Sequence, residues 1–516
     1  MRLPSLLALC LIATPGAAAE FRWSTGSDPQ TLDPHAAATA PVLGFLNNVY
    51  EGLVRRGRDM RIGPSLAERW EPLGTDGWRF HLRRGVTFHG GESFDADDVL
   101  FSYERASSEA SDVKAWFAPV REVRVVDDFT IDFLTHAPNP IFPDSIANFL
   151  IMDRGWAEAQ NAILPARDTE AGATTLTNGT GPFRVVERDP GVRTVLEPFE
   201  GWWDSAEHNV TRAIYEPRDS AATMIAALLS GEVDLINPVP LQDVERIRST
   251  DGMAVIEGIE ARVIMLGFAH QAETLSLDGT TPNPFREEAV RRAVAQAIEV
   301  EAITRVIMED AAEPVAQLVS PAMRGYSTAH TARPGFDVAA ARAGLAEAGH
   351  SDGFRFTLAC PNDRYLNDEA VCQAVVSMLA QIGLEAQLNA MPVRIYWDTL
   401  RAGEFDMYLL GWSPGTFDAE HPLRFLASTP NEEAKLGSWN FGGYSNARID
   451  ELLPAIQSEV DDTARQAMLD ESAAILQQEV AYVPLYVQPL VWGAREGVEV
   501  TQRPDDFLML RWVQVN

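Results

Sequence analysis

Residues 369–412 of the chain read EAVCQAVVSMLAQIGLEAQLNAMPVRIYWDTLRAGEFDMYLLGW and combine two apolar periodicities. Apolar side chains first recur every three or four residues until Gly383, which predicts a helix ended by a glycine. Residues 384–388 then alternate apolar and polar side chains, as strands do. A second helix over 394–401 and a second strand over 406–412 complete the series, which indicates an α/β fold.

Two further helix starts are indicated by their capping residues. Asp95 and Asp98 stand three residues apart at the head of an apolar stripe, the spacing of a capping box. Asn283 and Pro284 precede apolar residues at helical spacing up to Ile298, and proline favours the first turn of a helix. We therefore expect a helix to begin at each place.

The first third of the chain has a different pattern. Residues 78–82 alternate large apolar side chains with basic ones, and residues 123–133 contain further short β-rich runs. Such alternation is typical of antiparallel strands with one face in water. We expect a ribbon-rich unit here, beside the α/β part.

Length and charge limit the classes of function. The chain has 516 residues, 46% of them hydrophobic and 22% charged, which is a globular composition. At about 150 residues per domain it suggests about three folded units. It carries 42 basic and 74 acidic side chains, a formal charge of -32. Such a surface repels nucleic acid and anionic lipid, so we expect neither as a partner.

The N-terminal segment 1–19 has the features of a secretory signal peptide: Arg2, an apolar stretch and three alanines before Glu20. We expect cleavage near Ala19/Glu20 and export to the periplasm. The apolar stretch is too short to span about 30 Å of hydrocarbon, and no later segment holds 18 uninterrupted apolar residues.

Cleavage leaves two cysteines, Cys360 and Cys372, in an oxidising compartment. They are either bonded to each other, which would stabilise the fold by about 3 kcal/mol in the chain-entropy estimate, or two buried thiols. Two cysteines cannot form a Cys-rich zinc site or a disulfide framework.

Common catalytic signatures are absent from the sequence: there is no Gly-x-Ser-x-Gly elbow, His-Glu-x-x-His helix, phosphate loop or dinucleotide fingerprint. We therefore expect no enzyme, no catalytic residue and no cofactor. Asp418, Glu420 and His421 have side chains that suit a divalent ion. Because one segment rarely completes a coordination sphere, we favour a solvated loop there and expect no metal site.

Several segments occur together in a characteristic order: Asp28–Pro34, Ser65–Trp70, Trp78–Gly91, Phe94–Val99, Gly179–Phe183, Ser230–Asp234, Phe285–Ala293, Phe405–Asp406 with Gly411–Trp412, and Val483–Tyr486. Each is weak alone, but their order is specific. The chain thereby resembles the solute-binding proteins of peptide-type ABC importers (family 5), which include oligopeptide-, dipeptide-, glutathione- and nickel-binding proteins. The resemblance spans nearly all of the chain beyond the signal segment.

The resemblance implies a two-lobed α/β periplasmic binding protein of type II, with the Venus-flytrap arrangement and an extra subdomain on the first lobe. On this template lobe I is discontinuous, the extra subdomain is the ribbon-rich unit, and lobe II is one segment. The expected limits are 20–45, 180–265 and 485–516 for lobe I, 46–179 for the extra subdomain, and 266–484 for lobe II.

It also implies a receptor that closes on a small peptide or peptide-like solute and delivers it to an ABC permease, whose ATPase subunit supplies the energy. We expect a monomer. One alternative is a receptor of the same fold for a metal chelate, distinguished by Asp418 and His421, or for an opine or other solute. Another is a secreted hydrolase with dispersed carboxylates.

The resemblance further indicates candidate ligand-binding residues. Arg364 matches an arginine that receives the peptide carboxylate in peptide-binding relatives, and a guanidinium suits that task. The alternative for Arg364 is a surface ion pair with Asp363 or Asp368. Trp412 ends a predicted strand, at the edge where ligands of α/β sheets collect, and we expect it to wall the site.

Peptide-binding relatives carry an aspartate three residues beyond this tryptophan, where this chain has Gly415. Asp418 is the candidate substitute, and the shift puts a free dipeptide ligand in question. The remaining expected contacts are Ser413, Thr416, Thr180 and Gly181. The two from the Gly-Thr-Gly turn belong to lobe I, where glycine permits close approach of the backbone.

Overall fold

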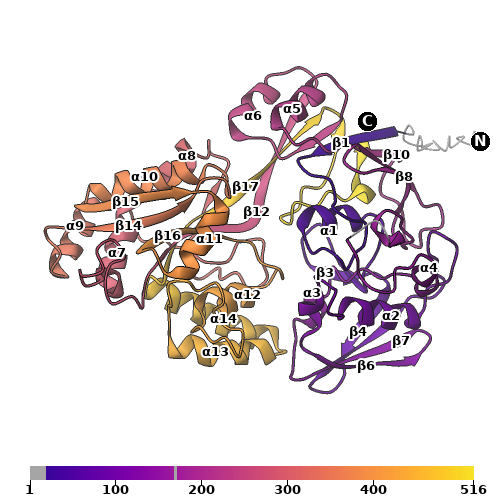
Figure 1. Cartoon of the computed structure of the whole chain (residues 1–516), viewed down its shortest axis with the longest axis horizontal. Helices are drawn as coiled ribbons and strands as arrows, with labels where there is room; N and C mark the ends of the chain where they lie inside the picture. The colour runs from indigo at the N-terminus through magenta and orange to yellow at the C-terminus, as the bar shows by residue number, and fades with distance from the viewer. Residues whose placement is uncertain (1–18, 168–170) are drawn as a thin grey trace, which may run out of the picture.

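The computed structural model describes residues 19–167 and 171–516 and shows two bodies joined by a pair of long strands, β12 (Met253–Phe268) and β17 (Tyr482–Arg495) (Figure 1). One mixed sheet runs through both bodies in the order β15-β14-β16-β12-β17-β11-β1-β10-β9-β8. Helices pack on it in each body. The predicted α/β class is confirmed.

Lobe I is the body that contains the start and the end of the described chain. Its half of the sheet consists of β1 (Ala19–Thr25), β8 (Phe183–Asp189), β9 (Arg193–Pro198), β10 (Val210–Tyr215) and β11 (Leu235–Asn237). Its helices are α1 (Ala40–Leu46), α5 (Ala221–Leu229) and α6 (Leu241–Arg248), and a short ribbon pairs β18 (Val498–Glu499) with β19 (Gln514–Val515). β1 lies between β10 and β11 and is parallel to both.

Lobe II is the second body. Its strands are β14 (Phe354–Pro361), β15 (Leu384–Met391) and β16 (Met407–Trp412), with the short β13 (Glu313–Pro314) beside β17. Its helices are α7 (Glu288–Ala297), α8 (Val300–Val306), α9 (Val338–Glu347), α10 (Asp368–Ala380), α11 (Val393–Ala402), α12 (Glu420–Pro422), α13 (Ala447–Ser458) and α14 (Asp462–Gln478). The helix–strand series predicted from residues 369–412 is confirmed as α10, β15, α11 and β16.

The extra subdomain has an antiparallel sheet in the order β4-β5-β7-β6 and a core of its own. Its strands are β2 (Val54–Arg56), β3 (Ile62–Pro64), β4 (Ala67–Pro72), β5 (Gly77–Leu82), β6 (Val120–Asp127) and β7 (Thr130–Thr135), and its helices α2 (Ala96–Ala106), α3 (Phe142–Ser145) and α4 (Arg154–Ala159). The predicted capping box at Asp95 and Asp98 starts α2. The antiparallel ribbons expected in this region are confirmed.

The helix expected to begin at Asn283 does not begin there. The Asn283 side chain accepts the Phe285 amide and closes only a single 3-10 turn, Pro284–Arg286. Glu287 is extended, with φ -85° and ψ 126°, so the α-helix α7 starts at Glu288. The apolar spacing was correct, but one extended residue separates the turn from the helix.

The pairing of β12 and β17 is interrupted between the two bodies, and we call this interruption the hinge. Met253–Ile259 pairs with Arg495 back to Pro489, and pairing resumes at Val263 with Val487. Glu260, Ala261 and Arg262 of β12 have no paired residue on β17. Gln488 is the β17 residue left unpaired opposite them. We take this gap as the crossing between the lobes. We therefore propose lobe limits at about residue 261 on β12 and residue 488 on β17, in place of the expected 265 and 485.

The predicted signal segment 1–19 lies outside the described residues, except Ala19 at the start of β1. Among residues 19–167 and 171–516, no helix combines the length and apolar character needed to cross a bilayer.

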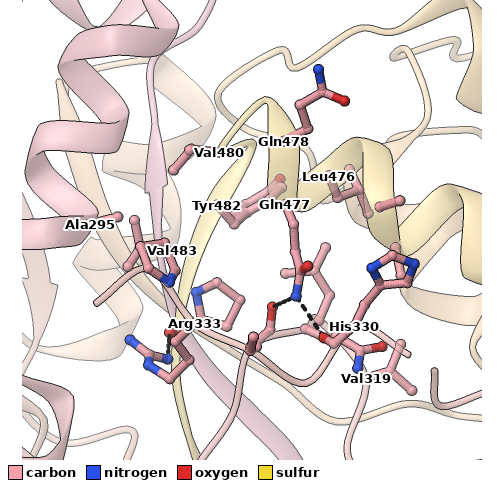
Figure 2. Close-up of a pocket in the computed structure, with 18 of the residues that line it drawn as sticks. Ala295, Val319, His330, Arg333, Leu476, Gln477, Gln478, Val480, Tyr482 and Val483 are labelled. Atoms are coloured by element: carbon pink, nitrogen blue, oxygen red, sulfur yellow. Dashed lines mark hydrogen bonds between the residues drawn. The ribbon is translucent and has the colours of Figure 1, made fainter. Parts of the chain in front are cut away.

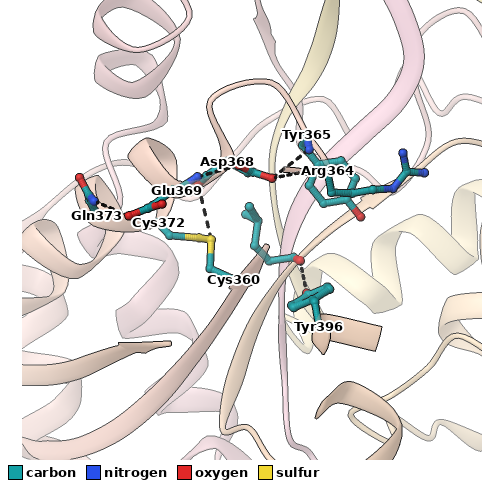
Figure 3. Close-up of a disulfide and its surroundings, with 9 residues drawn as sticks. Cys360, Arg364, Tyr365, Asp368, Glu369, Cys372, Gln373 and Tyr396 are labelled. Atoms are coloured by element: carbon teal, nitrogen blue, oxygen red, sulfur yellow. Dashed lines mark hydrogen bonds between the residues drawn. A yellow bond between two sulfur atoms is a disulfide. The ribbon is translucent and has the colours of Figure 1, made fainter. Parts of the chain in front are cut away.

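A disulfide joins Cys360 at the end of β14 to Cys372 in α10, with the two Cα atoms 6.6 Å apart (Figure 3). The question left open by the sequence is thus resolved in favour of the bond. It closes a segment of lobe II that contains Arg364 and leads into the cleft between the lobes.

Candidate functional site: the cleft between the lobes

A cavity of about 560 Å³ lies between the lobes at the hinge, within the range of known small-molecule sites. Residues of all three regions line it. From lobe I and its subdomain come Leu43, Asn148, Val239, Asp505, Asp506 and Phe507; from the hinge Glu260, Arg262, Gln488 and Pro489; from lobe II Leu366, Ser413, Pro414, Gly415 and Phe417. A solute held here would touch both lobes.

The floor of the cavity is a hydrogen-bonded set of hinge residues. Arg262 Nη2 donates to Glu260 Oε1 over 2.9 Å, and Gln488 Nε2 donates to Glu260 Oε2 over 2.7 Å. Gln488 Oε1 in turn accepts the Leu366 amide of lobe II at 3.4 Å. The hinge thus holds its own charges in pairs and contacts the segment that follows β14.

The lobe II wall is the loop that follows β16, Ser413–Phe417. Its end is fixed by Asp418, whose two oxygens accept Arg465 Nη1 and Nη2 at 2.9 and 2.7 Å in an almost fully buried pair. The main chain of Arg324 adds two hydrogen bonds, to Phe417 and Ala419. Two rigid attachments therefore hold this loop toward the cavity.

Asp418 was a candidate ligand contact. In the structure it lies at the end of the loop and outside the lining of the cavity. It is 1% exposed, does not line the cavity, and its carboxylate already binds a guanidinium and the Glu420 amide. The sequence gives no sign of this pairing, because the partner, Arg465, is 47 residues away in sequence and lies on α14. We therefore assign Asp418 to positioning the loop rather than to the solute.

Glu420 and His421, the other two residues considered as metal ligands, also have hydrogen-bond partners within the protein. Glu420 accepts a hydrogen bond from Gln457, and His421 Nε2 accepts the Gly415 amide at 3.2 Å. Burial lowers the pKa of His421 to about 4, with Arg424 adding to the shift, so the ring is neutral and can accept this bond. The described residues contain no group of three His, Cys, Asp or Glu side chains placed to hold a metal ion.

Trp412 lies beneath this loop in an aromatic cluster. It is 8% exposed, and the ring centroids of His421, Phe425 and Trp439 lie 5.3 to 5.7 Å from its own. Among the described residues, four buried polar atoms of the segment 412–424 have no hydrogen-bond partner: Trp412 Nε1, Thr416 Oγ1, His421 Nδ1 and Arg424 Nε. Unpaired buried polar atoms are costly, so their concentration next to the cavity marks this loop for polar contacts.

Arg364 lies in the loop after β14, closed by the disulfide, and its exposed side chain points away from Asp368 (Figure 3). Asp368 accepts the backbone amides of Arg364 and Tyr365, while Asp363 accepts the Val393 amide. In the described chain no ion pair joins Arg364 to either aspartate. Its guanidinium lies 5.5 Å from the Tyr365 ring centroid, and Arg262 lies 5.9 Å from the same ring.

Thr180 and Gly181 lie in lobe I, behind the cavity. Thr180 Oγ1 donates to Glu51 Oε2 over 3.0 Å, and the Gly181 amide donates to Val49 O over 2.9 Å. A Cβ on Gly181 would lie 2.7 Å from the Val49 carbonyl, so this close approach requires glycine. Neither residue lines the cavity.

A second cavity, of about 450 Å³, lies inside lobe II between α14, β17 and the segment 316–334 (Figure 2). It shares no lining residue with the cleft. Its polar groups hold the loop in place: Gln477 Nε2 donates to the carbonyls of Ala316 and His330, and Arg333 Nη1 to those of Val315 and Pro484. The cleft is lined by residues of both lobes and has the charged groups Glu260, Arg262, Asp505 and Asp506 in its wall, so it is the better candidate for a solute.

The sequence matches the family model of bacterial extracellular solute-binding proteins, family 5, over residues 61–433. The chain belongs to this family. Among curated family relatives, the glutathione-binding protein GsiB of Salmonella paratyphi A is 26% identical over 502 residues, covering 94% of this chain and 92% of that protein. The same protein of Pectobacterium atrosepticum is 25% identical over 496 residues, covering 93% and 91%.

Solved structures of similar fold agree. HbpA2 of Haemophilus parasuis matches with a TM-score of 0.84 and 21% identity, over 96% of this chain and all of that one. The periplasmic binding protein DppA of Helicobacter pylori, in complex with the peptide STSA, matches with a TM-score of 0.72 and 23% identity, over 96% and 97%. The two-lobed periplasmic binding protein fold expected from the sequence is confirmed.

Several lining residues of this family 5 protein were not among the expected ones, notably Glu260, Arg262, Gln488 and Asp506. One signal was available: Glu260 and Arg262 interrupt a 16-residue strand that is otherwise largely apolar. Charged residues inside such a strand need a polar neighbourhood. Asp506 gave no comparable signal, because its place in the cleft depends on how the C-terminal segment packs on lobe I.

Proposed function

We propose that this protein is the extracytoplasmic receptor of an ABC importer and captures a small peptide or peptide-like solute between its lobes. The observation that carries the proposal is the cavity at the hinge, which is lined by residues of both lobes and has its charged groups on lobe I and the hinge. Closing the lobes would bury the solute, exclude water and strengthen its polar contacts. Family membership and the glutathione-binding relatives support this class of solute.

In the proposed complex the solute's carboxylate binds Arg364, an exposed residue two positions before Leu366, which lines the cavity. Ser413 lines the lobe II side of the cavity, and Trp412 and Thr416, which are its neighbours in the chain but do not line the cavity, support this wall. Thr180 and Gly181 act behind the cleft, by fixing the lobe I backbone.

The proposal includes location and assembly. The signal segment is removed near Ala19/Glu20 during export to the periplasm, which takes only the first residue of β1. The receptor is a monomer, requires no cofactor and releases the solute unchanged. It then docks on a membrane permease, whose separate ATPase subunit drives transport.

Isothermal titration of the purified protein with glutathione and with the peptide Ser-Thr-Ser-Ala tests the proposal. We expect binding of at least one, a smaller radius of gyration when bound, and recovery of the intact compound. Arg364→Ala should weaken binding of a free-acid peptide by about 2 to 5 kcal/mol but spare its C-terminal amide. Arg401→Ala, which changes an exposed arginine on α11, is the matched control. Failure of a broad peptide library to bind, or cleavage of the peptide, would contradict the receptor assignment.

A further inference from the structure

Three carboxylates line the cleft, and they differ in their partners. Glu260 is paired with Arg262, and Asp505 is paired with Arg503, whose Nε donates to Asp505 Oδ1 over 2.9 Å. Asp506 has no ion pair within the described residues. Among the described residues, Asp506 is therefore the only carboxylate lining the cleft that forms no ion pair with an arginine or a lysine.

The surroundings of Asp506 leave acceptor atoms unused. Asp506 Oδ1 accepts Trp492 Nε1 at 2.8 Å and Asn237 Nδ2 at 3.0 Å. No donor in the described chain reaches Asp506 Oδ2, and Asn237 Oδ1 is buried without a partner. Asp506 lines the cleft, and Asn237, which does not line it, donates to Asp506 and adjoins the lining residue Pro238.

The carboxylate is held there by its backbone. Asp506 has a left-handed conformation, with φ 63°, which aspartate tolerates better than most residues. Its amide donates to Arg503 O over 2.9 Å. Trp492 and Asn237 belong to β17 and β11, so strands of the central sheet fix the side chain.

The electrostatics of this corner favour a cation. Burial raises the pKa of Asp506 to about 7; the hydrogen bonds from Trp492 and Asn237 oppose this shift, and the charges of Glu260 and Asp505 add to it. A positive group with N–H donors would satisfy both free oxygens and stabilise the ionised carboxylate.

We propose that Asp506, together with Asn237, binds an ammonium group of the captured solute at the lobe I side of the cleft. This inference rests on the proposed function and adds to it the class of solute: one with a cationic amine as well as a carboxylate. Arg364 of lobe II would hold the carboxylate, so each lobe would bind one charged end. Only a solute that carries both ends would then hold the lobes together.

The test titrates glutathione and Ser-Thr-Ser-Ala, each against its N-acetylated form, into the wild type and Asp506→Asn. Asparagine keeps an Oδ1 acceptor for Trp492 and Asn237, so the fold should survive, as thermal unfolding will verify. Asp398→Asn is the matched control, because Asp398 is 82% exposed on α11 and does not line the cleft.

We expect the wild type to bind the free amine at least about 30-fold more tightly than the acetylated form. Asp506→Asn should lose most of this preference, by weakening the free amine while sparing the acetylated form. Equal wild-type affinity for both forms, or an unchanged preference in Asp506→Asn, would overturn the ammonium site and leave the receptor function intact. If the variant does not fold, the wild-type comparison alone decides. If no probe or library peptide binds the wild type, both proposals fail.

Discussion

Asp144 Oδ2 lies 3.6 Å from Arg324 Nη1, and this ion pair joins the extra subdomain to lobe II. Close by, the guanidinium of Arg56 on β2 lies 4.9 Å from the ring centroid of Phe417, which lines the cavity. The extra subdomain therefore contacts both the opposing lobe and the loop of the proposed site.

Removing this contact should change how far apart the lobes stand. The Arg324 side chain is 40% exposed, so the pair contributes less than about 1 kcal/mol and is screened by salt. We expect Arg324→Ala to increase the radius of gyration of the free protein at low salt, measured by X-ray scattering, and the difference to shrink at high salt. Arg401→Ala should scatter like the wild type. Identical low-salt curves for Arg324→Ala and wild type would show that the pair does not set the lobe spacing.

The Asp418–Arg465 pair should be required for stability, because both side chains are almost fully buried. Changing only one partner strands a buried charge, so Asp418→Asn or Arg465→Met alone should lower the free energy of unfolding by about 3 to 5 kcal/mol. The double variant should lose less than the sum of the two. Urea unfolding of the four proteins gives the coupling energy, and additive losses would argue against a direct pair.

The disulfide should stabilise lobe II through its closed loop. The bonded cysteines are 12 residues apart, for which the chain-entropy estimate is about 3 kcal/mol. We expect the free energy of unfolding of the Cys360→Ser, Cys372→Ser double variant to be about 3 kcal/mol lower. The variant should therefore unfold at a lower urea concentration. Dithiothreitol should destabilise the wild type but not the variant; equal sensitivity in both would mean that the bond is absent from the protein.

His35 should make the protein sensitive to acid. Burial, with Arg105 adding to it, lowers the pKa of His35 to about 3 from an ordinary value of 6.5. The unfolded chain therefore binds the extra proton first. Neutral His35 leaves the folded protein at its full stability above pH 6.5. The free energy of unfolding falls as the pH drops below 6.5, and this loss ends near pH 3.

Stability measured against pH should show this effect. Within the window, His35→Gln should reduce the slope of unfolding free energy by up to about 1.4 kcal/mol per pH unit. His136→Gln, which changes an exposed histidine in the same way, is the matched control. Equal slopes for wild type and His35→Gln would mean that His35 is protonated in the folded protein.

Local signals in the sequence were sufficient for much of the fold. The helix that became α10 was predicted from apolar spacing and from Gly383, which indeed has a left-handed φ of 85°. The capping box at Asp95 was equally local. The start of α7 was not predictable in this way, because the extended conformation of Glu287 depends on how the preceding turn packs.

The candidate site was less predictable, because its geometry comes from distant segments. The loop after Trp412 was found by its resemblance to a family motif, and Ser413 and Gly415 do line the cavity. The role of Asp418 depends on Arg465, and that of Asp506 on Trp492 and Asn237. No periodicity or spacing within one segment reveals such pairings.

The position of β17 in the sheet has a consequence for biosynthesis. β11 pairs with β1 on one side and with β17 on the other, yet β17 is synthesised long after both. Until then β11 presents an open strand edge, a template for pairing with other chains. Shortening the protein from its carboxyl end should therefore cause aggregation of the nascent product as well as loss of the cleft.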